Sequence, residues 1–254
     1  MTLILKTAPA GAYRYIAYQS QYSLGVQALP GHRLVRASFA QVVPLAEGFA
    51  RIRAHLQARG LPLASFAACE LRSPKPFDSD GFRAFNAVYA DTLQAWGIAD
   101  GDDNPVARSN VCPLVDGPAE PGFHAFCYAM PEAATSAASF VVSGGAETRT
   151  VSRPGEHRIV AFGDTSAQGM LAKGEHTIAE IERRLQAFGL GWRDTSAIQV
   201  YTVHDFHPVV AAQMAQRGML RNGLTWQLCR PPVVDVEFEI DCRGGIEEIV
   251  LGTP

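Results

Sequence analysis

Cysteine is scarce in this chain of 254 residues, and its distribution excludes two classes of protein. The five cysteines are Cys69, Cys112, Cys127, Cys229 and Cys242. An odd number without C-x-x-C spacing argues against a disulfide framework and against a zinc site. We therefore expect most of them to be buried and to act as small apolar residues.

The chain also has no large excess of charge of one sign and no long apolar run. Charged residues make up 19% of the chain and the formal net charge is -3, which gives no basic surface for nucleic acid or an anionic membrane. No apolar run approaches the roughly 18 residues of a membrane-spanning helix, and the first residues do not have the pattern of a signal peptide. We expect a cytoplasmic protein with no nucleic-acid or membrane partner.

Three short segments occur twice, in the same order. They are HRLV at 32–35 and HRIV at 157–160, LQARGL at 56–61 and LQAFGL at 185–190, and FNAV at 85–88 and FHPV at 206–209. Similar segments that recur in the same order indicate two copies of one small domain. We expect residues 1–135 to form the first domain and 150–254 the second, joined by the junction 136–149.

Apolar spacing predicts a similar order of elements in each half. In the first half it predicts strands at 33–43, 65–71, 106–112 and 122–130, and helices at 44–60 and 80–96. In the second half it predicts strands at 158–162, 196–203, 224–228 and 233–241, a loop at 163–174, and helices at 177–188 and 208–217. Each half is expected to be an α+β unit with its helices on one face of a sheet.

Several of these segments form a recognisable pattern. FNAVY at 85–89 is followed, after a loop, by PVARSNV at 105–111, with YSLGV at 22–26 and ASFAQ at 37–41 before them. The second half has GDTSAQ at 163–168 and VEFE at 236–239. The chain resembles the Rid (RidA/YjgF-like) superfamily, whose motifs include YSQGV, S-G-Q, P-A-R-[ST]-x-V and a terminal V-E-I-E. The resemblance implies two tandem RidA-like (chorismate-mutase-like) domains, each a mixed sheet with two helices packed on one face.

Arg108 is the first candidate for a functional residue. An arginine at the start of a strand can present its planar fork to a carboxylate, although it can equally form a surface or interface ion pair. The resemblance implies the first role, with the backbone N–H of Asn110 completing the anion site. It also matches Tyr22 to a family tyrosine that borders the pocket from a neighbouring subunit; a partly buried strand tyrosine is the alternative.

The acid is expected in the other half. Family enzymes use a carboxylate on the last strand to position the attacking water, and Glu237 matches that position, whereas the first half has His124 or an adjacent residue there. His124 could shuttle protons because its ordinary pKa is near neutral, or it could be a core histidine. The second half has Gly223 or a neighbour where Arg108 should recur. A composite site across the domains or between subunits is one hypothesis, and divergent decay of one copy is the other.

The resemblance implies a cofactor-free hydrolytic deaminase that acts on a small enamine or imine carboxylate. The doubled length favours a dedicated substrate, for which we expect 2-aminomuconate or a chloro derivative. Arg36, Arg221 and Arg230 are candidates for the cation that a second carboxylate requires. No metal or organic cofactor is expected, since His204 and His207 straddle a predicted strand end and helix start.

Three expectations remain open at this point. Family members are typically trimers with sites between subunits, so we expect a homotrimer. Another Rid-fold hydrolase or lyase, such as a chorismatase, is an alternative function. A non-catalytic metabolite-binding protein that uses Arg108 to hold its ligand is a second alternative.

Overall fold

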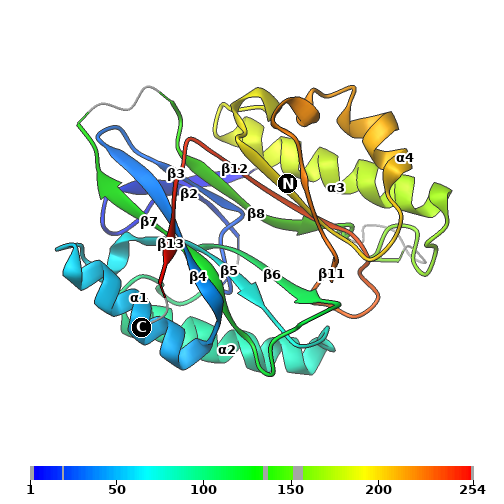
Figure 1. Ribbon diagram of the computed structural model, residues 1–254. Coiled ribbons are helices and arrows are strands. Elements are labelled where there is room, and N and C mark those ends of the chain that lie inside the picture. The colour runs from blue at the N-terminus through cyan, green and yellow to red at the C-terminus, as the bar shows by residue number, and fades with distance from the viewer. Residues whose placement is uncertain (1–2, 19, 134–136, 151–156, 253–254) are drawn as a thin grey trace.

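Two β-sheets face each other in the middle of the molecule, and helices cover their outer faces (Figure 1). The computed structural model describes residues 3–18, 20–133, 137–150 and 157–252. The seven-stranded sheet contains, in spatial order, β1 (Ile4–Thr7), β2 (Tyr13–Ala17), β3 (Gly25–Ala28), β8 (Phe140–Ala146), β12 (Glu239–Gly244), β9 (Ala197–Tyr201) and β10 (Thr225–Gln227). The six-stranded sheet contains β11 (Cys229–Arg230), β6 (Ala107–Pro113), β5 (Phe66–Arg72), β7 (Gly122–Pro131), β4 (His32–Pro44) and β13 (Glu247–Leu251).

The helices follow from local sequence patterns. In α1 (Leu45–Ala58), Phe49, Ile52 and Leu56 lie on one face and pack on the six-stranded sheet beside α2 (Ser79–Ala95). The other sheet is covered by α3 (Ala167–Ala187), α4 (His207–Val209) and the π-helical turn Val210–Met214. Short 3-10 turns occur at Leu63–Ser65, Trp192–Asp194 and Met219–Asn222. In the described part of the chain, no helix has the length and apolarity to cross a membrane.

The sheets share one arrangement of four strands. The order β6-β5-β7-β4 in one sheet corresponds to β10-β9-β12-β8 in the other. In both sets the first pair is parallel and the other two are antiparallel. The α+β class and the mixed sheets are therefore confirmed.

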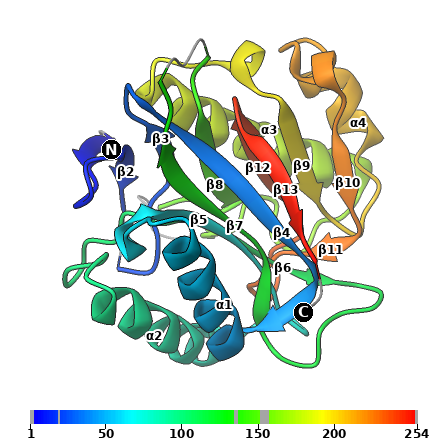
Figure 2. The same cartoon turned by 60° about the vertical axis from the view of Figure 1, so that its left-hand side comes forward.

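The sheets do not follow the expected domain boundaries. Strands β1 to β3, from the start of the chain, extend the sheet that holds the C-terminal strands. Conversely, β13 from the C-terminal end pairs in parallel with β4 (Figure 2). The junction expected at 136–149 contains β8, at the centre of the seven-stranded sheet. Each sheet is thus built from both ends of the chain.

The second half contains the main local errors of the sequence prediction. The segment 158–162, predicted as a strand, is a bridge and a turn, and α3 begins at Ala167 rather than 177. Glycine and a buried lysine obscured the helical period in that first stretch of α3. Gly174 is required there because a Cβ would collide with Val209. Strand β8 was missed because its Ser143-Gly144-Gly145 segment has low strand propensity.

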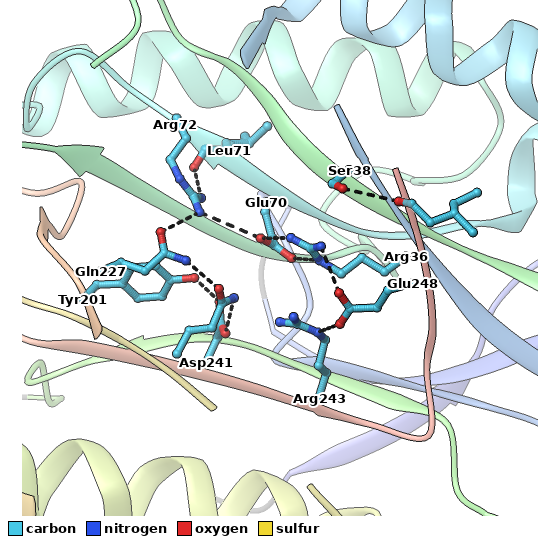
Figure 3. Close-up of polar contacts among 12 residues, drawn as sticks. Arg36, Ser38, Glu70, Leu71, Arg72, Tyr201, Gln227, Asp241, Arg243 and Glu248 are labelled. Atoms are coloured by element: carbon cyan, nitrogen blue, oxygen red, sulfur yellow. Dashed lines mark hydrogen bonds and ion pairs between the residues drawn. The ribbon is translucent and has the colours of Figure 1, made fainter. Parts of the chain in front are cut away.

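The space between the sheets is apolar at one end and charged at the other. The apolar part includes Tyr13, Val26 and Ala129. In the charged part, Arg36 donates to both oxygens of Glu70 at 2.5 and 2.8 Å (Figure 3). Burial would raise the pKa of Glu70, but its hydrogen bonds and charge contact with Arg36 lower the pKa to about 2. The five cysteines are buried and free, as expected.

The C-terminal strand is attached to both sheets through the same network. Glu248 on β13 accepts from Arg36 at 3.4 Å and from Arg243 at 2.8 Å (Figure 3). Arg36 belongs to the six-stranded sheet and Arg243 to the seven-stranded sheet. The pair between Glu248 and Arg243 therefore crosses from one sheet to the other and helps to fix how the sheets are positioned relative to each other.

Candidate active site

The side chain of Arg108 lies inside a cage of aromatic rings. Strand β6 presents its guanidinium 5.0 Å from the ring centre of Tyr89 on α2 and 5.1 Å from that of Tyr22. Phe82 and Phe85 on α2 contribute two more rings at 6.0 and 5.8 Å. Arg108 is only 4% exposed. Cation–π contacts of this kind stabilise the charge but do not neutralise it.

Unpaired polar atoms gather around this cage. Nη1 of Arg108 is buried without a hydrogen-bond partner, and Arg108 forms no ion pair among the described residues. Nδ2 of Asn110 and both side-chain amide atoms of Asn86 are also buried and unpaired. Asn110 shares the Arg108 face of β6, and Asn86 lies next to Phe85 on α2. Because buried polar groups are normally satisfied, this cluster indicates the place of a polar ligand.

The backbone of β6 adds a donor on its open edge. The N–H of Arg108 donates to Oγ of Ser143 at 3.0 Å, across to the other sheet. Backbone N–H groups alternate in direction along a strand, so the N–H of Asn110 points the same way. This orientation agrees with the anion-binding role expected for Asn110. The side-chain oxygen of Asn110 is used elsewhere, since it accepts from Ser73 at 3.0 Å.

Glu239, at the start of β12, has its carboxyl group next to Gly144 and is within electrostatic range of Arg108. It is 5% exposed, and its carboxyl group forms no hydrogen bond with any described residue. Burial raises its pKa to about 8, aided by the carboxylates of Asp241 and Glu147, while Arg184 and Arg108 partly oppose the shift. Glu239 is therefore mostly protonated at neutral pH.

Tyr22 lies among these charges. Burial raises its pKa, with a further contribution from Tyr18, so the phenol stays protonated. Arg184 and Arg108 act in the opposite direction, and Glu239 raises the pKa again. Tyr22 is thus within electrostatic range of Arg108 from one sheet, Glu239 from the other, and Arg184 from α3.

Two glycines on β8 make room for the charged groups. A Cβ on Gly144 would collide with the carboxyl group of Glu239, and a Cβ on Gly145 would crowd Arg184. Arg184 is 6% exposed, and its Nη1 donates to the carbonyl oxygens of Ser143 at 3.0 Å and Gly144 at 3.3 Å. Ser143-Gly144-Gly145 matches two letters of the S-G-Q motif, as does Ser166-Ala167-Gln168.

The structure does not bring Glu237 to Arg108. Oε2 of Glu237 lies 2.8 Å from Nε2 of His204 and accepts from Arg230 at 2.8 Å. The strand predicted at 233–241 begins only at Glu239, and Asp235 has a φ of 70°. Because this irregular backbone precedes the strand, the two glutamates of VEFE have different surroundings. The geometry favours Glu239 as the acid.

His124 is also separate from the Arg108 cage. It stands on β7, where burial and then Arg72 lower its pKa to about 4, against a smaller effect of Glu70. It is therefore neutral at physiological pH and lies close to the charged network between the sheets. Nδ1 of His207 lies within hydrogen-bond distance of Asp205. The described residues contain no group of three side chains that could hold a metal ion, at His204, His207 or elsewhere.

The candidate cations for a second carboxylate have other partners or surroundings. Arg36 is bound to Glu70, and Arg230 to Glu237. Arg221 is exposed in the short turn Met219–Asn222. Sequence reasoning missed Arg184, because its approach to Tyr22 and Glu239 depends on how α3 packs on β8. It also missed Glu239, although the doubled glutamate of VEFE was a visible signal.

The arrangement combines an anion anchor with a protonated acid. Arg108 comes from the six-stranded sheet and Glu239 from the seven-stranded sheet, so a site that uses both residues would draw on both sheets. A cationic anchor can hold a substrate carboxylate in a fixed orientation, and a neutral carboxyl group can donate a proton and later accept one. These are the groups that acid–base chemistry on a small carboxylate requires.

Comparisons with known proteins agree with this chemistry. The model of a family described as 2-aminomuconate deaminase CnbZ matches residues 5–249. A 2-amino-5-chloromuconate deaminase of Comamonas testosteroni is 48% identical over 244 residues, which are 95% of this chain and 96% of that protein. Among solved structures, a chorismatase aligns with 95% of this chain and 79% of its own, at 12% identity and a TM-score of 0.47. The YjgF gene product of E. coli aligns with 52% of this chain and 91% of its own, at 17% identity and a TM-score of 0.32. By the extent of the family match and the identity to the Comamonas enzyme, the chain belongs to the CnbZ family of 2-aminomuconate deaminases.

Proposed function

We propose that this protein hydrolyses the C–N bond of 2-aminomuconate, or of a chloro derivative, and releases ammonia. The observation that carries the proposal is the buried, caged guanidinium of Arg108, which has no ion-pair partner among the described residues and is within electrostatic range of the carboxyl group of Glu239. The 48% identity to a protein named 2-amino-5-chloromuconate deaminase supports the choice of substrate.

The residues suggest the following course. Arg108 and the N–H of Asn110 hold one substrate carboxylate. Glu239 donates its proton to the enamine carbon, which gives an iminium ion, and the resulting carboxylate accepts a proton from the water that adds to the C=N carbon. The nitrogen of the carbinolamine then takes this proton from Glu239, ammonia leaves as the C=O bond forms, and the hydroxyl proton returns to the carboxylate. One water is consumed, and the product is the keto acid or its enol.

The test is ammonia release, followed together with ultraviolet absorbance, from freshly generated 2-aminomuconate and its 5-chloro derivative. The proposal predicts release well above the spontaneous rate. If neither substrate is hydrolysed faster than in buffer, the proposed reaction is overturned. Tight binding of 2-aminomuconate without turnover would indicate a metabolite-binding protein instead.

We also propose that the chain is a tandem pair of Rid-like units, supported by the shared strand orders β6-β5-β7-β4 and β10-β9-β12-β8 and by the repeated segments. From the resemblance and the composition we propose a homotrimer and a cytoplasmic location. Size-exclusion chromatography with light scattering tests the first of these two.

We further propose that Arg184 recognises the distal carboxylate of a dicarboxylate substrate. Its Nη1 and Nε are occupied by backbone oxygens and Glu180, while its charge reaches both Tyr22 and Glu239. Arg184→Met is expected to weaken inhibition by muconate about 10- to 100-fold and to leave inhibition by the monocarboxylate sorbate nearly unchanged. Inhibition constants of both compounds are the measurement.

The neighbouring Arg183 provides a matched control for this experiment. It pairs with Glu180 on the same helix and is 40% exposed at its side chain. Arg183→Met should keep the wild-type preference for muconate. Equal weakening of muconate and sorbate in Arg184→Met would contradict a role specific to the second carboxylate.

A further inference from the structure

A buried ion pair lies just behind the candidate active site. Nζ of Lys173 on α3 is 3.3 Å from Oε1 of Glu147, which directly follows β8, and both side chains are 0% exposed. Nζ also donates to the carbonyl oxygen of Val160 at 3.0 Å. Lysine and glutamate are almost never fully buried, and such a pair is weak as a source of stability because desolvation offsets the attraction. A role beyond stability is therefore worth seeking.

The carboxylate of Glu147 holds the backbone that leads into β12. Its Oε1 accepts the N–H of Glu237 at 2.6 Å, and its Oε2 accepts the N–H of Phe238 at 3.0 Å. The next residue is Glu239, which pairs in register with Ala146, the neighbour of Glu147. Two consecutive N–H groups are thus fixed immediately before the residue that the proposed function uses as its acid.

We propose that Glu147, held in place by Lys173, is the positioning residue for Glu239: it sets the start of β12 and supplies a negative charge behind the acid. The inference rests on the proposed function, in which Glu239 transfers the proton. Burial raises the pKa of Glu147, while hydrogen bonds from two backbone N–H groups and the ammonium of Lys173 oppose this shift and favour the charged form. That charge disfavours ionisation of Glu239 and so helps to keep the proton on it.

Other charged and titratable groups surround Glu239, and they define what Glu147 adds. Asp241 stands on the same strand, Arg108 on β6, and Arg184 on α3, with Tyr22 in the loop before β3. Cys112 and Cys229 are close enough to sense the charge of Glu239, but burial raises the pKa of both thiols. Both arginines favour the ionised acid, whereas burial opposes them most strongly and the carboxylates of Asp241 and Glu147 add to its effect.

The test is the pH profile of kcat/KM for Glu147→Gln. The variant keeps the size of the side chain and one acceptor oxygen but removes the charge and leaves Lys173 unpaired. We expect the alkaline limb, where Glu239 loses its proton, to move down by about one pH unit, with kcat reduced and KM little changed. Glu175 is exposed on α3, the helix that carries Lys173, so Glu175→Gln should keep the wild-type profile.

A second variant distinguishes an effect on Glu239 from a loss of stability caused by an unpaired, buried Lys173. Glu147→Gln combined with Lys173→Met removes both charges and replaces the pair with neutral side chains of similar size. The alkaline limb should remain shifted in this double variant. A limb at the wild-type position in a folded variant would overturn the proposal, whether kcat is changed or not. The proposed function itself fails separately, through absence of turnover in the wild type.

Discussion

Replacing Arg108 with methionine is expected to lower kcat/KM for 2-aminomuconate by about 10²- to 10³-fold. The guanidinium is the one charged group inside the cage formed by Tyr22, Phe82, Phe85 and Tyr89. Without it, the substrate carboxylate would be buried in the cage without the countercharge that Arg108 supplies. Steady-state kinetics and a binding constant for muconate measure the loss.

The same substitution should make the protein more stable. In the absence of ligand, Arg108 is 4% exposed, and its buried Nη1 has no hydrogen-bond partner. A buried, unpaired donor is costly, and methionine has a similar length without that cost. We expect a melting temperature a few degrees above wild type, since one kcal/mol corresponds to about 2–4 °C in a chain of this size.

Controls can separate this prediction from a general effect of losing an arginine. Arg53 lies 5.6 Å over the ring of Trp96 but is exposed on α1, so Arg53→Met should change neither activity nor stability appreciably. Arg108→Lys keeps the charge but loses the planar fork, and it should recover only part of the activity. Unchanged turnover in Arg108→Met would refute the anion anchor.

The second large effect is expected for Glu239→Gln. The amide cannot donate a carboxyl proton to the enamine carbon or take one from water, so kcat should fall by about 10²- to 10⁴-fold. Binding of muconate should be retained, because Arg108 and Asn110 are unchanged. A folded variant with more than about a tenth of wild-type kcat would exclude Glu239 as the proton-transfer group.

The stability of Glu239→Gln should depend on pH in a defined direction. The pKa of Glu239 rises from an ordinary value of 4.5 to about 8 in the folded protein. Between these values the folded protein retains a proton that the unfolded chain has released, so this residue makes wild-type stability fall as the pH rises. The glutamine variant lacks that dependence.

We therefore expect the melting temperature of Glu239→Gln to exceed that of wild type increasingly from about pH 5 to 8 and to stay higher above it. The measurement is a series of thermal unfolding curves across this range. Glu175→Gln, an exposed change on α3, should follow the wild-type curve at every pH. Parallel curves for wild type and Glu239→Gln would mean that the carboxyl group ionises normally.

Predictions made from the sequence were most accurate where contacts are local. The helices α1 and α2 and the strands β4 to β7 lie close to their expected ranges, because each has a clear apolar period and a well-marked end. Arg108 and the α2 rings around it were accessible for the same reason. A helix and the strand that follows it in one unit pack against each other, so the pattern FNAVY…ARSNV already implies their proximity.

The acid of the candidate site, in contrast, depends on contacts between distant segments. Glu237 and Glu239 are two residues apart in an alternating segment, and the sequence offers no way to choose between them. The choice depends on where β12 begins, which Glu147 fixes through hydrogen bonds to the backbone of Glu237 and Phe238. The sequence places Ser143 and Gly144 in the junction between domains. That Gly144 leaves space for the carboxyl group of Glu239 is visible only in the packed structure.

The sequence by itself determined the α+β class, the family resemblance and the arginine that anchors the substrate in the proposed reaction. These depend on periodicity and on motifs within single units of the chain. The tertiary structure alone decided that Glu239 comes within electrostatic range of Arg108 and Arg184, and that each sheet takes strands from both ends of the chain. These features follow from how two sheets face each other, and strand periodicity does not specify which distant strand lies opposite.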